Sequence, residues 1–253
     1  MNNIDAPKRI LWHRVPSRIT TTSPFFVYDS EPNLYKLLDK MGIISGGQIQ
    51  AHRILYPNSK KTRQILSKLS KDYKIVKHIL KMGNKDYSLY TLGPRGAKLI
   101  NAEYQPDYWF SYTDNEVIER ILTLEFYLKL SDYLSAELIV KPAEPPYVYT
   151  FSHSDKIYNI GMVWDNATRF IETYRWSPPE ERTILLCDEI TQLDCLLEYF
   201  KDYTPVRAIT REKIKGELVF YRPEKNQWVL DVPNRQIKQK IDKKIIRRKK
   251  ILI

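Results

Sequence analysis

The chain has 253 residues, of which 43% are hydrophobic and 12% aromatic, and this composition excludes a protein that is disordered over most of its length. No segment approaches the roughly 18 to 20 consecutive apolar residues of a membrane helix, and the N-terminus has no secretory signal pattern, so we expect a cytoplasmic protein with no membrane partner. The net charge of +11 indicates a polyanionic partner.

The positive charge is concentrated in two segments. Residues 32–104 carry 14 basic and 4 acidic side chains, and residues 235–253 carry 9 and 1. The segment between them is acidic, with 14 basic and 22 acidic side chains, and residues 1–31 are nearly balanced, with 4 and 3. A solvated surface explains a single charged run, but two basic blocks around an acidic one favour binding to a nucleic acid or to an anionic membrane surface.

The first part of the chain predicts an arm followed by three short helices. Residues 1–31 are rich in proline, serine and threonine, which is typical of an extended arm. Helices are expected over 32–42 and over 45–55, and Ser45 is a suitable cap for the second. The segment 59–73, SKKTRQILSKLSKDY, predicts a third helix, because its apolar residues recur at helical spacing and its charged residues take the other face.

A β-hairpin and a closing helix follow. The runs KIVKHILKMG and DYSLYTLG are joined at Gly83, Asn84 and Lys85, a turn sequence that tolerates positive φ. A short helix, PRGAKLINA, ends the module, and its glycines lack the Walker spacing, so we expect them to serve the turn and close packing. Three helices, a hairpin and a closing helix are typical of a winged helix-turn-helix domain, which we place at residues 32–104.

The third helix is the expected recognition helix. Such a helix lays its N-terminal half in the major groove and needs long donors and amides there, although many winged helices bind proteins instead. Arg63 is assigned to a base, because a guanidinium group bonds guanine O6 and N7 together, and the lysines are assigned to phosphates. The residues predicted to contact DNA in this module are Lys60, Lys61, Arg63, Gln64 and Ser67 on the helix and Lys81, Asn84 and Lys85 at the hairpin tip.

The second half predicts a small mixed α/β domain over residues 105–234. A long amphipathic helix over 114–134 precedes the strand-like runs AELIV, YVYTF and IYNIGMVW and a helix at NATRFIETYRW. The segments TILLC, EITQLDCLLEYFK and VRAIT indicate a strand, a helix and a strand joined by a right-handed crossover, and further strands are expected at ELVFY and QWVLD. Cys187 and Cys195 have apolar neighbours and are expected in the core. The fold class is therefore α+β.

A basic tail completes the chain at residues 235–253. Its isoleucines are near helical spacing, so it is either a basic amphipathic helix or a disordered arm that folds on an anion. Arg247 and Arg248 are the residues in this segment predicted to bind DNA, through its phosphates.

A hydrolytic site is weighed against this interpretation. Metal-dependent cleavage of DNA needs two or three carboxylates around a cation, and the candidates are Glu144, Asp155 and Asp165, with Lys156 beside them. However, the central run IYNIGMVW is apolar and carries no Glu and Lys two positions apart. No histidine stands in a metal-ligand spacing with a cysteine, and no nucleophile elbow is present. We therefore assign no catalytic residue, metal or cofactor.

The order of parts, and above all the hairpin and helix of YSLYTLGPRGAKLI ahead of an α/β domain, resembles the replication-relaxation family of plasmid and conjugative-element proteins over residues 32–222. The stretch MVWDNATRFIETYRWSPPEERTILLC is similar to a family segment with an aspartate and a tyrosine, at Asp165 and Tyr174 here. Val163 stands where the family has a glutamate. The resemblance therefore implies a restriction-endonuclease-like α/β domain kept as a scaffold, and an accessory role in replicating, nicking or maintaining a mobile element.

These observations together predict a non-enzymatic protein that binds double-stranded DNA in the replication, relaxation and transfer, or maintenance of a plasmid or other mobile element. The acidic α/β domain is expected to hold a replication or relaxase protein, or a second copy of the chain as a homodimer. Two alternatives stay open at this point. One is a metal-dependent DNA nuclease that uses the α/β domain, and the other is a winged-helix transcription regulator.

Overall fold

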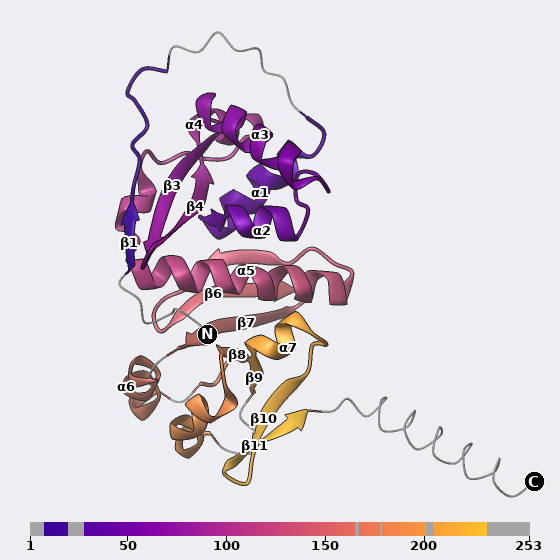
Figure 1. Cartoon of the computed structure of the whole chain (residues 1–253). Coiled ribbons are helices and arrows are strands. Elements are labelled where there is room, and N and C mark those ends of the chain that lie inside the picture. The colour runs from indigo at the N-terminus through magenta and orange to yellow at the C-terminus, as the bar shows by residue number, and fades with distance from the viewer. Residues whose placement is uncertain (1–7, 20–27, 165–166, 178, 201–204, 232–253) are drawn as a thin grey trace, which may run out of the picture. The chain divides into compact units, whose positions relative to one another are not determined.

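The chain divides into an N-terminal unit, Met1–Phe126, and a C-terminal unit, Tyr127–Ile253. The computed structural model (Figure 1) describes residues 8–19, 28–164, 167–177, 179–200 and 205–231. Its described elements are helices and two β-sheets, one in each unit, so the protein belongs to the α+β class that the sequence predicts.

The N-terminal unit combines helices with a small antiparallel sheet. The strands described in it pair in the order β1-β3-β4-β2, and a two-residue turn joins β3 to β4. The division between the units falls inside the last helix, α5. The elements are β1 (Lys8–Leu11), α1 (Glu31–Met41), β2 (Ile44–Ser45), α2 (Gly46–Ala51), α3 (Ser59–Lys71), β3 (Ile75–Met82), β4 (Lys85–Leu92), α4 (Pro94–Leu99), the 3₁₀ helix η2 (Tyr108–Ser111) and α5 (Asp114–Leu134).

Local side chains explain where these helices begin. The Ser45 side chain accepts a hydrogen bond from the Gln48 backbone N–H at 3.2 Å, and the Gln48 side chain accepts one from the Ser45 backbone N–H at 3.3 Å, which forms a capping box for α2. Pro94 opens α4 beside two glycines. A Cβ atom on Gly96 would lie 2.1 Å from the Lys74 carbonyl oxygen, and one on Gly93 would lie 2.3 Å from the Tyr73 carbonyl oxygen. The glycines therefore permit close backbone packing, as the sequence predicts.

The core of the N-terminal unit includes segments from both sides of residues 32–104. Ile10 of β1 packs in one apolar cluster with Leu80 of β3 and Val117 of α5. The sequence pattern places residues 8–11 in an extended arm and begins the second domain at residue 105. In the structure, β1 pairs with the sheet, and the first half of α5 belongs to this core. The sequence does not predict this, because neighbouring residues do not specify which partner a four-residue strand or one helix face will take.

A buried ion pair connects α1 to the residues that follow α3. The Lys74 Nζ atom lies 3.2 Å from Glu31 Oε2, and the Tyr35 hydroxyl donates a hydrogen bond of 2.6 Å to the same oxygen. Burial and the Glu31 carboxylate raise the pKa of the Tyr35 hydroxyl, so it remains a donor. Lys74 is only 2% exposed and therefore does not belong to the charged outer face of the neighbouring helix.

His78 is a second buried polar residue of this unit. Its Nδ1 atom accepts a hydrogen bond of 3.1 Å from the His13 backbone N–H, and its Nε2 atom lies 2.9 Å from Thr91 Oγ1. Desolvation, and to a lesser extent the charge of His13, lowers the pKa of His78 to about 3. The imidazole is therefore neutral near pH 7, with its proton on Nε2 and directed at Thr91.

The C-terminal unit contains a larger, mixed sheet. The strands described in it pair in the order β11-β10-β9-β8-β7-β6-β5, in which β7, β8 and β9 are parallel and the other pairs are antiparallel. The predicted parallel strands TILLC and VRAIT are confirmed as β8 and β9. The elements are β5 (Ile139–Pro142), β6 (Tyr147–His153), β7 (Lys156–Val163), α6 (Thr168–Trp176), β8 (Thr183–Cys187), the 3₁₀ helix η3 (Ile190–Tyr199), β9 (Val206–Thr210), α7 (Arg211–Lys215), β10 (Phe220–Glu224) and β11 (Gln227–Asp231).

Helices α6 and η3 cover one face of this sheet. Phe170 of α6 and Leu196 of η3 pack against Leu185 of β8 in an apolar cluster. Cys187 belongs to the same cluster, and burial raises the pKa of its thiol to about 12. Cys195 is exposed, which corrects the expectation of a core position, because it lies on the outer side of η3.

Candidate nucleic-acid interface

Helix α3 separates a buried apolar face from an exposed polar one. Thr62, Ile65, Leu66 and Leu69 are buried. The structure brings together on the exposed side all five of the helix residues that the sequence assigned to DNA, which are Lys60, Lys61, Arg63, Gln64 and Ser67.

The N-terminal end of α3 is fixed by three interactions. The Asn58 side chain accepts a hydrogen bond of 3.1 Å from the Lys61 backbone N–H and so caps the helix. The Thr62 hydroxyl donates to the Tyr56 carbonyl oxygen at 3.2 Å, and the Lys61 ammonium lies 3.8 Å from the centre of the Tyr56 ring. Arg63, by contrast, has no side-chain hydrogen bond or ion pair with any residue that the structure describes. Its guanidinium group therefore stays available to a ligand.

The hairpin tip carries the other predicted contacts. Lys81, Asn84 and Lys85 are exposed where β3 turns into β4. Gly83 takes a φ of 55° in the turn, a conformation that glycine adopts without a steric penalty. The two cations thus stand on either side of a tight turn.

Sequence reasoning missed two cations next to this hairpin. Arg9 of β1 lies opposite Lys81 in the strand register, and Lys77 points to the same side of β3 as Lys81 because the two are four residues apart. Both are exposed. The alternation in KRIL and KIVKHILK signals strands, but only the pairing of β1 with β3 brings Arg9 and Lys81 together. Residues 1–126 carry 19 basic and 12 acidic side chains, so the N-terminal unit is net positive.

The carboxylates considered for metal-dependent cleavage do not converge. Glu144 lies in the turn before β6, and Asp155 lies in the turn after it, next to Lys156 at the start of β7. A seven-residue strand therefore separates the two carboxylates. Among the described residues, no group of three or more His, Cys, Asp or Glu is placed to hold a metal ion. Asp165 lies outside the described residues.

Val163 and Tyr174 lie inside the apolar cluster beneath α6. Val163 is 0% and Tyr174 is 1% exposed, and both pack with Phe170. The Tyr174 hydroxyl lies 3.2 Å from the Tyr147 hydroxyl, and burial raises the pKa of Tyr174. The surroundings of Val163 are thus apolar or uncharged, which is unfavourable for a carboxylate at this position.

The tail residues Arg247 and Arg248, the remaining predicted DNA contacts, lie outside the described residues. None of the helices in the described part of the chain is both long and apolar enough to cross a membrane. Comparisons with protein-family models, curated proteins and solved structures give no match for this chain. Its function is therefore inferred from the fold and the surface residues.

Proposed function

We propose that this chain is a non-enzymatic duplex DNA-binding protein with a preference for a particular sequence. One observation carries the proposal: α3 is a capped helix whose inner face is buried and whose exposed face presents Lys60, Arg63 and Gln64. Arginine and glutamine are the side chains that read guanine and adenine edges through paired hydrogen bonds, and lysine suits phosphate. These residues occupy the N-terminal half of the helix, which is the half that enters the major groove in helix-turn-helix proteins.

The order of elements supports a winged helix. A helix, a short strand, two helices and a hairpin follow one another as α1, β2, α2, α3, β3 and β4, and β2 pairs with β4. The β3–β4 hairpin then acts as the wing. Lys81 and Lys85 are exposed on this hairpin, and Arg9 lies opposite Lys81 on β1. These three side chains contribute positive charge for phosphate contacts beside the groove that α3 enters.

The C-terminal unit acts as a nuclease-like scaffold in this proposal. The meander of β5, β6 and β7, followed by α6 and the parallel strand β8, supports the nuclease-like interpretation. The apolar packing around Val163 and the separation of Glu144 from Asp155 favour a structural role over catalysis. A scaffold of this kind would hold a replication or relaxase protein, or a second copy of the chain, in the cytoplasm.

The biological setting follows from the resemblance to the replication-relaxation family. We infer from it an accessory role in the replication, transfer or maintenance of a plasmid or other mobile element. Mapping the bound sites across its replicon tests this setting. A replication or transfer factor is expected over an origin, whereas occupancy of promoters would identify a transcription regulator instead.

Arg63→Ala is expected to weaken binding to the preferred duplex by about 1–3 kcal/mol, which is roughly 5- to 150-fold, and to relax the base preference at one position. The physical reason is the loss of a paired hydrogen bond to one base. The preferred site is first selected from a pool of random duplexes, and the affinities are then measured by fluorescence anisotropy on that site and on a scrambled one.

Arg175→Ala is the matched control, because Arg175 is an exposed arginine on α6 of the other unit. It should leave both affinities unchanged. An equal loss on the selected and scrambled duplexes for Arg63→Ala would make Arg63 a phosphate contact. Failure of the pool to enrich any sequence would contradict the proposed sequence preference itself.

Deletion of residues 235–253 is expected to reduce the slope of log affinity against log salt concentration, by about 0.9 for each phosphate that the tail neutralises in the full chain. This segment contains 9 basic side chains and 1 acidic one, so we expect it to bind DNA through ionic contacts with the phosphates. The slope is measured between low and physiological salt on a duplex of fixed length. An unchanged slope would show that the tail does not touch DNA.

A cleavage assay tests the non-enzymatic part of the proposal. The full chain is incubated with supercoiled and linear DNA in the presence of magnesium or manganese, and no cleavage is expected. Cleavage that the Asp165→Ala substitution abolishes would establish the nuclease alternative, in which the winged helix only delivers the α/β unit to DNA.

A further inference from the structure

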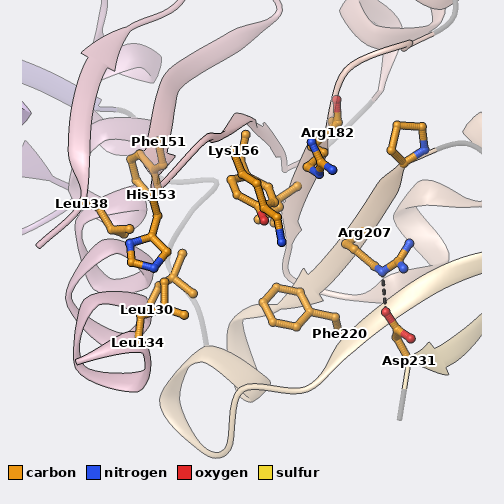
Figure 2. A pocket seen from close by; sticks show the side chains of 14 residues that line it. Leu130, Leu134, Leu138, Phe151, His153, Lys156, Arg182, Arg207, Phe220 and Asp231 are labelled. Atoms are coloured by element: carbon orange, nitrogen blue, oxygen red, sulfur yellow. Dashed lines mark hydrogen bonds and ion pairs between the residues drawn. The ribbon is translucent and has the colours of Figure 1, made fainter. Parts of the chain in front are cut away.

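A cavity of about 430 Å³ lies within the C-terminal unit (Figure 2), and nothing in the DNA-binding proposal uses it. Strand alternation places Ile184 and Arg207, which line the cavity, on the sheet face opposite Leu185 and Val206. Leu185 and Val206 pack with α6 and η3, so the cavity opens on the other face of the sheet. Its volume falls within the range of about 300–1,000 Å³ that is typical of small-molecule sites.

The two ends of this cavity, called here the cationic pocket, differ in character. Leu130, Leu134 and Leu138 lie at one end, together with His153. Arg182 and Arg207 lie at the other end, as Figure 2 shows. Phe151 and Phe220 supply aromatic rings to the lining. The lining of the pocket therefore suits a molecule with an apolar body and a charged head.

The charge of the pocket selects the sign of that head. Between residues 127 and 231 the sequence has 13 basic and 17 acidic side chains, yet the lining contains Lys156, Arg182 and Arg207 against a single carboxylate, Asp231. The pocket lining is therefore net positive, although residues 127–231 as a whole are net negative. Such clustering costs electrostatic repulsion unless an anion offsets it.

Two of these cations, Lys156 and Arg182, have no carboxylate partner among the residues that the structure describes. Arg207 donates a hydrogen bond from Nε to the Asp231 carboxylate, and Arg222 lies 3.9 Å from the same carboxylate. Neither Lys156 nor Arg182 forms an ion pair with any carboxylate in the described ranges. Arg182 directly precedes β8 and Lys156 begins β7, so regular strands hold both near the pocket.

We propose that the cationic pocket binds a small organic anion, a phosphate monoester or a carboxylate that carries an apolar body. Lys156 and Arg182 bind the anionic head through charge-assisted hydrogen bonds, and Arg207 is held in place by Asp231. The leucines of α5 and the aromatic rings cover the apolar body. The C-terminal segment of the chain is a poor occupant, since residues 235–253 carry 9 basic side chains and 1 acidic one and would be repelled by the pocket cations.

Titration of the full chain with two anionic probes tests the proposal. The probes are 1-naphthyl phosphate and decanoate, with the neutral 1-naphthol and 1-decanol as matched controls, and binding is followed by amide chemical shifts and by calorimetry. Saturable one-to-one binding is expected for at least one anion and for neither alcohol. Preference for the naphthyl probe identifies an aromatic phosphate as the ligand type, and preference for decanoate identifies an aliphatic carboxylate.

Substitutions at the two ends of the pocket locate the binding. Arg182→Gln and Lys156→Gln should each weaken the favoured anion about tenfold, the loss expected when one charge-assisted hydrogen bond disappears. Both residues are exposed, so these variants should fold normally. Leu134→Gln, at the apolar end, should weaken the same probe, while Arg175→Gln on α6 should not.

Three results would overturn the proposal. The first is the absence of saturable binding of either anion at millimolar concentration. The second is wild-type affinity in both Arg182→Gln and Lys156→Gln. The third is binding of a single-stranded oligonucleotide by these residues in place of the small anions, which would assign the pocket to nucleic acid. Because Arg63 belongs to the other unit, Arg63→Ala should leave the small-anion affinity unchanged, and this separates the two proposals.

Discussion

Replacement of Lys74 with alanine is expected to lower the free energy of unfolding of the N-terminal unit by about 3–5 kcal/mol, the cost typical of breaking a buried ion pair from one side. Lys74 is 2% and Glu31 is 0% exposed, so the substitution would leave a carboxylate buried without its counter-charge. The Tyr35 hydroxyl would remain as a donor to Glu31 Oε2, but Glu31 Oε1 already has no hydrogen-bond partner within the described residues. The free energy of unfolding is measured in urea, with the hydrogen exchange of the β3 and β4 backbone amides as the readout.

The control and a double variant distinguish charge from packing. Lys71→Ala removes an exposed lysine at the end of α3 and should change the stability by less than about 0.5 kcal/mol. Combining Glu31→Met with Lys74→Met removes both charges and should recover part of the loss, because apolar replacement of a whole buried pair is often close to neutral, whereas the buried Tyr35 hydroxyl loses its acceptor. A loss below about 1 kcal/mol in Lys74→Ala would mean that water reaches the pair.

If the chain binds DNA as proposed, this ion pair also affects that binding. Lys74 follows α3 by three residues and contacts the first residue of α1, so the pair ties the C-terminal end of α3 to α1. A recognition helix must be held rigidly for its side chains to reach base edges together. We therefore expect Lys74→Ala to reduce specific affinity indirectly, through the position of α3.

Lowering the pH from 7 to 5 is expected to cost about 2 kcal/mol of stability through His78 alone. Burial lowers the pKa of His78 to about 3 in the folded protein, below its ordinary value of 6.5. Between these two pKa values, His78 is protonated in the unfolded chain and neutral in the folded chain. The stabilisation from the neutral imidazole is complete above pH 6.5 and falls by about 1.4 kcal/mol for each pH unit between 6.5 and 3.

Two histidine variants test this assignment. His78→Asn removes the titrating group, so the loss of stability between pH 7 and pH 5 should shrink by about 2 kcal/mol whatever the stability at pH 7. His52→Asn changes an exposed histidine of the same unit and should leave the pH dependence as it is. The stability is again read from amide exchange of β3 and β4. An unaltered pH dependence in His78→Asn would mean that the imidazole is protonated at no cost in the folded state.

Structural features that depend only on residues close together in the sequence were predictable in this protein. The buried face of α3 follows from the spacing of Ile65, Leu66 and Leu69, and the exposed positions of Lys60, Arg63 and Gln64 follow from the same periodicity. The β3–β4 hairpin follows from two β-like runs around Gly83 and Asn84. Strands β8 and β11 begin and end where the sequence predicts, because each is a short apolar run with clear breaks on both sides.

Features that depend on partners distant in the sequence were not predictable. Lys74 stands among charged residues in the sequence, and only its contact with Glu31, 43 positions earlier, explains its burial. Arg9 comes to lie beside Lys81 of the hairpin only through the pairing of β1 with β3. Glu144 and Asp155 are plausible metal ligands in the sequence, and the length of β6 separates them.

The sequence by itself determined the α+β class, the helix and hairpin of the basic module and the set of side chains that α3 exposes, because periodicity and turn chemistry act over a few residues. Only the tertiary structure decided the core of the N-terminal unit, the Glu31–Lys74 pair and the cationic pocket. The pocket joins the second half of α5 to residues on several strands, and their neighbourhood is set by strand order and register. Those depend on burial of whole sheet faces, a free energy that no short segment carries alone.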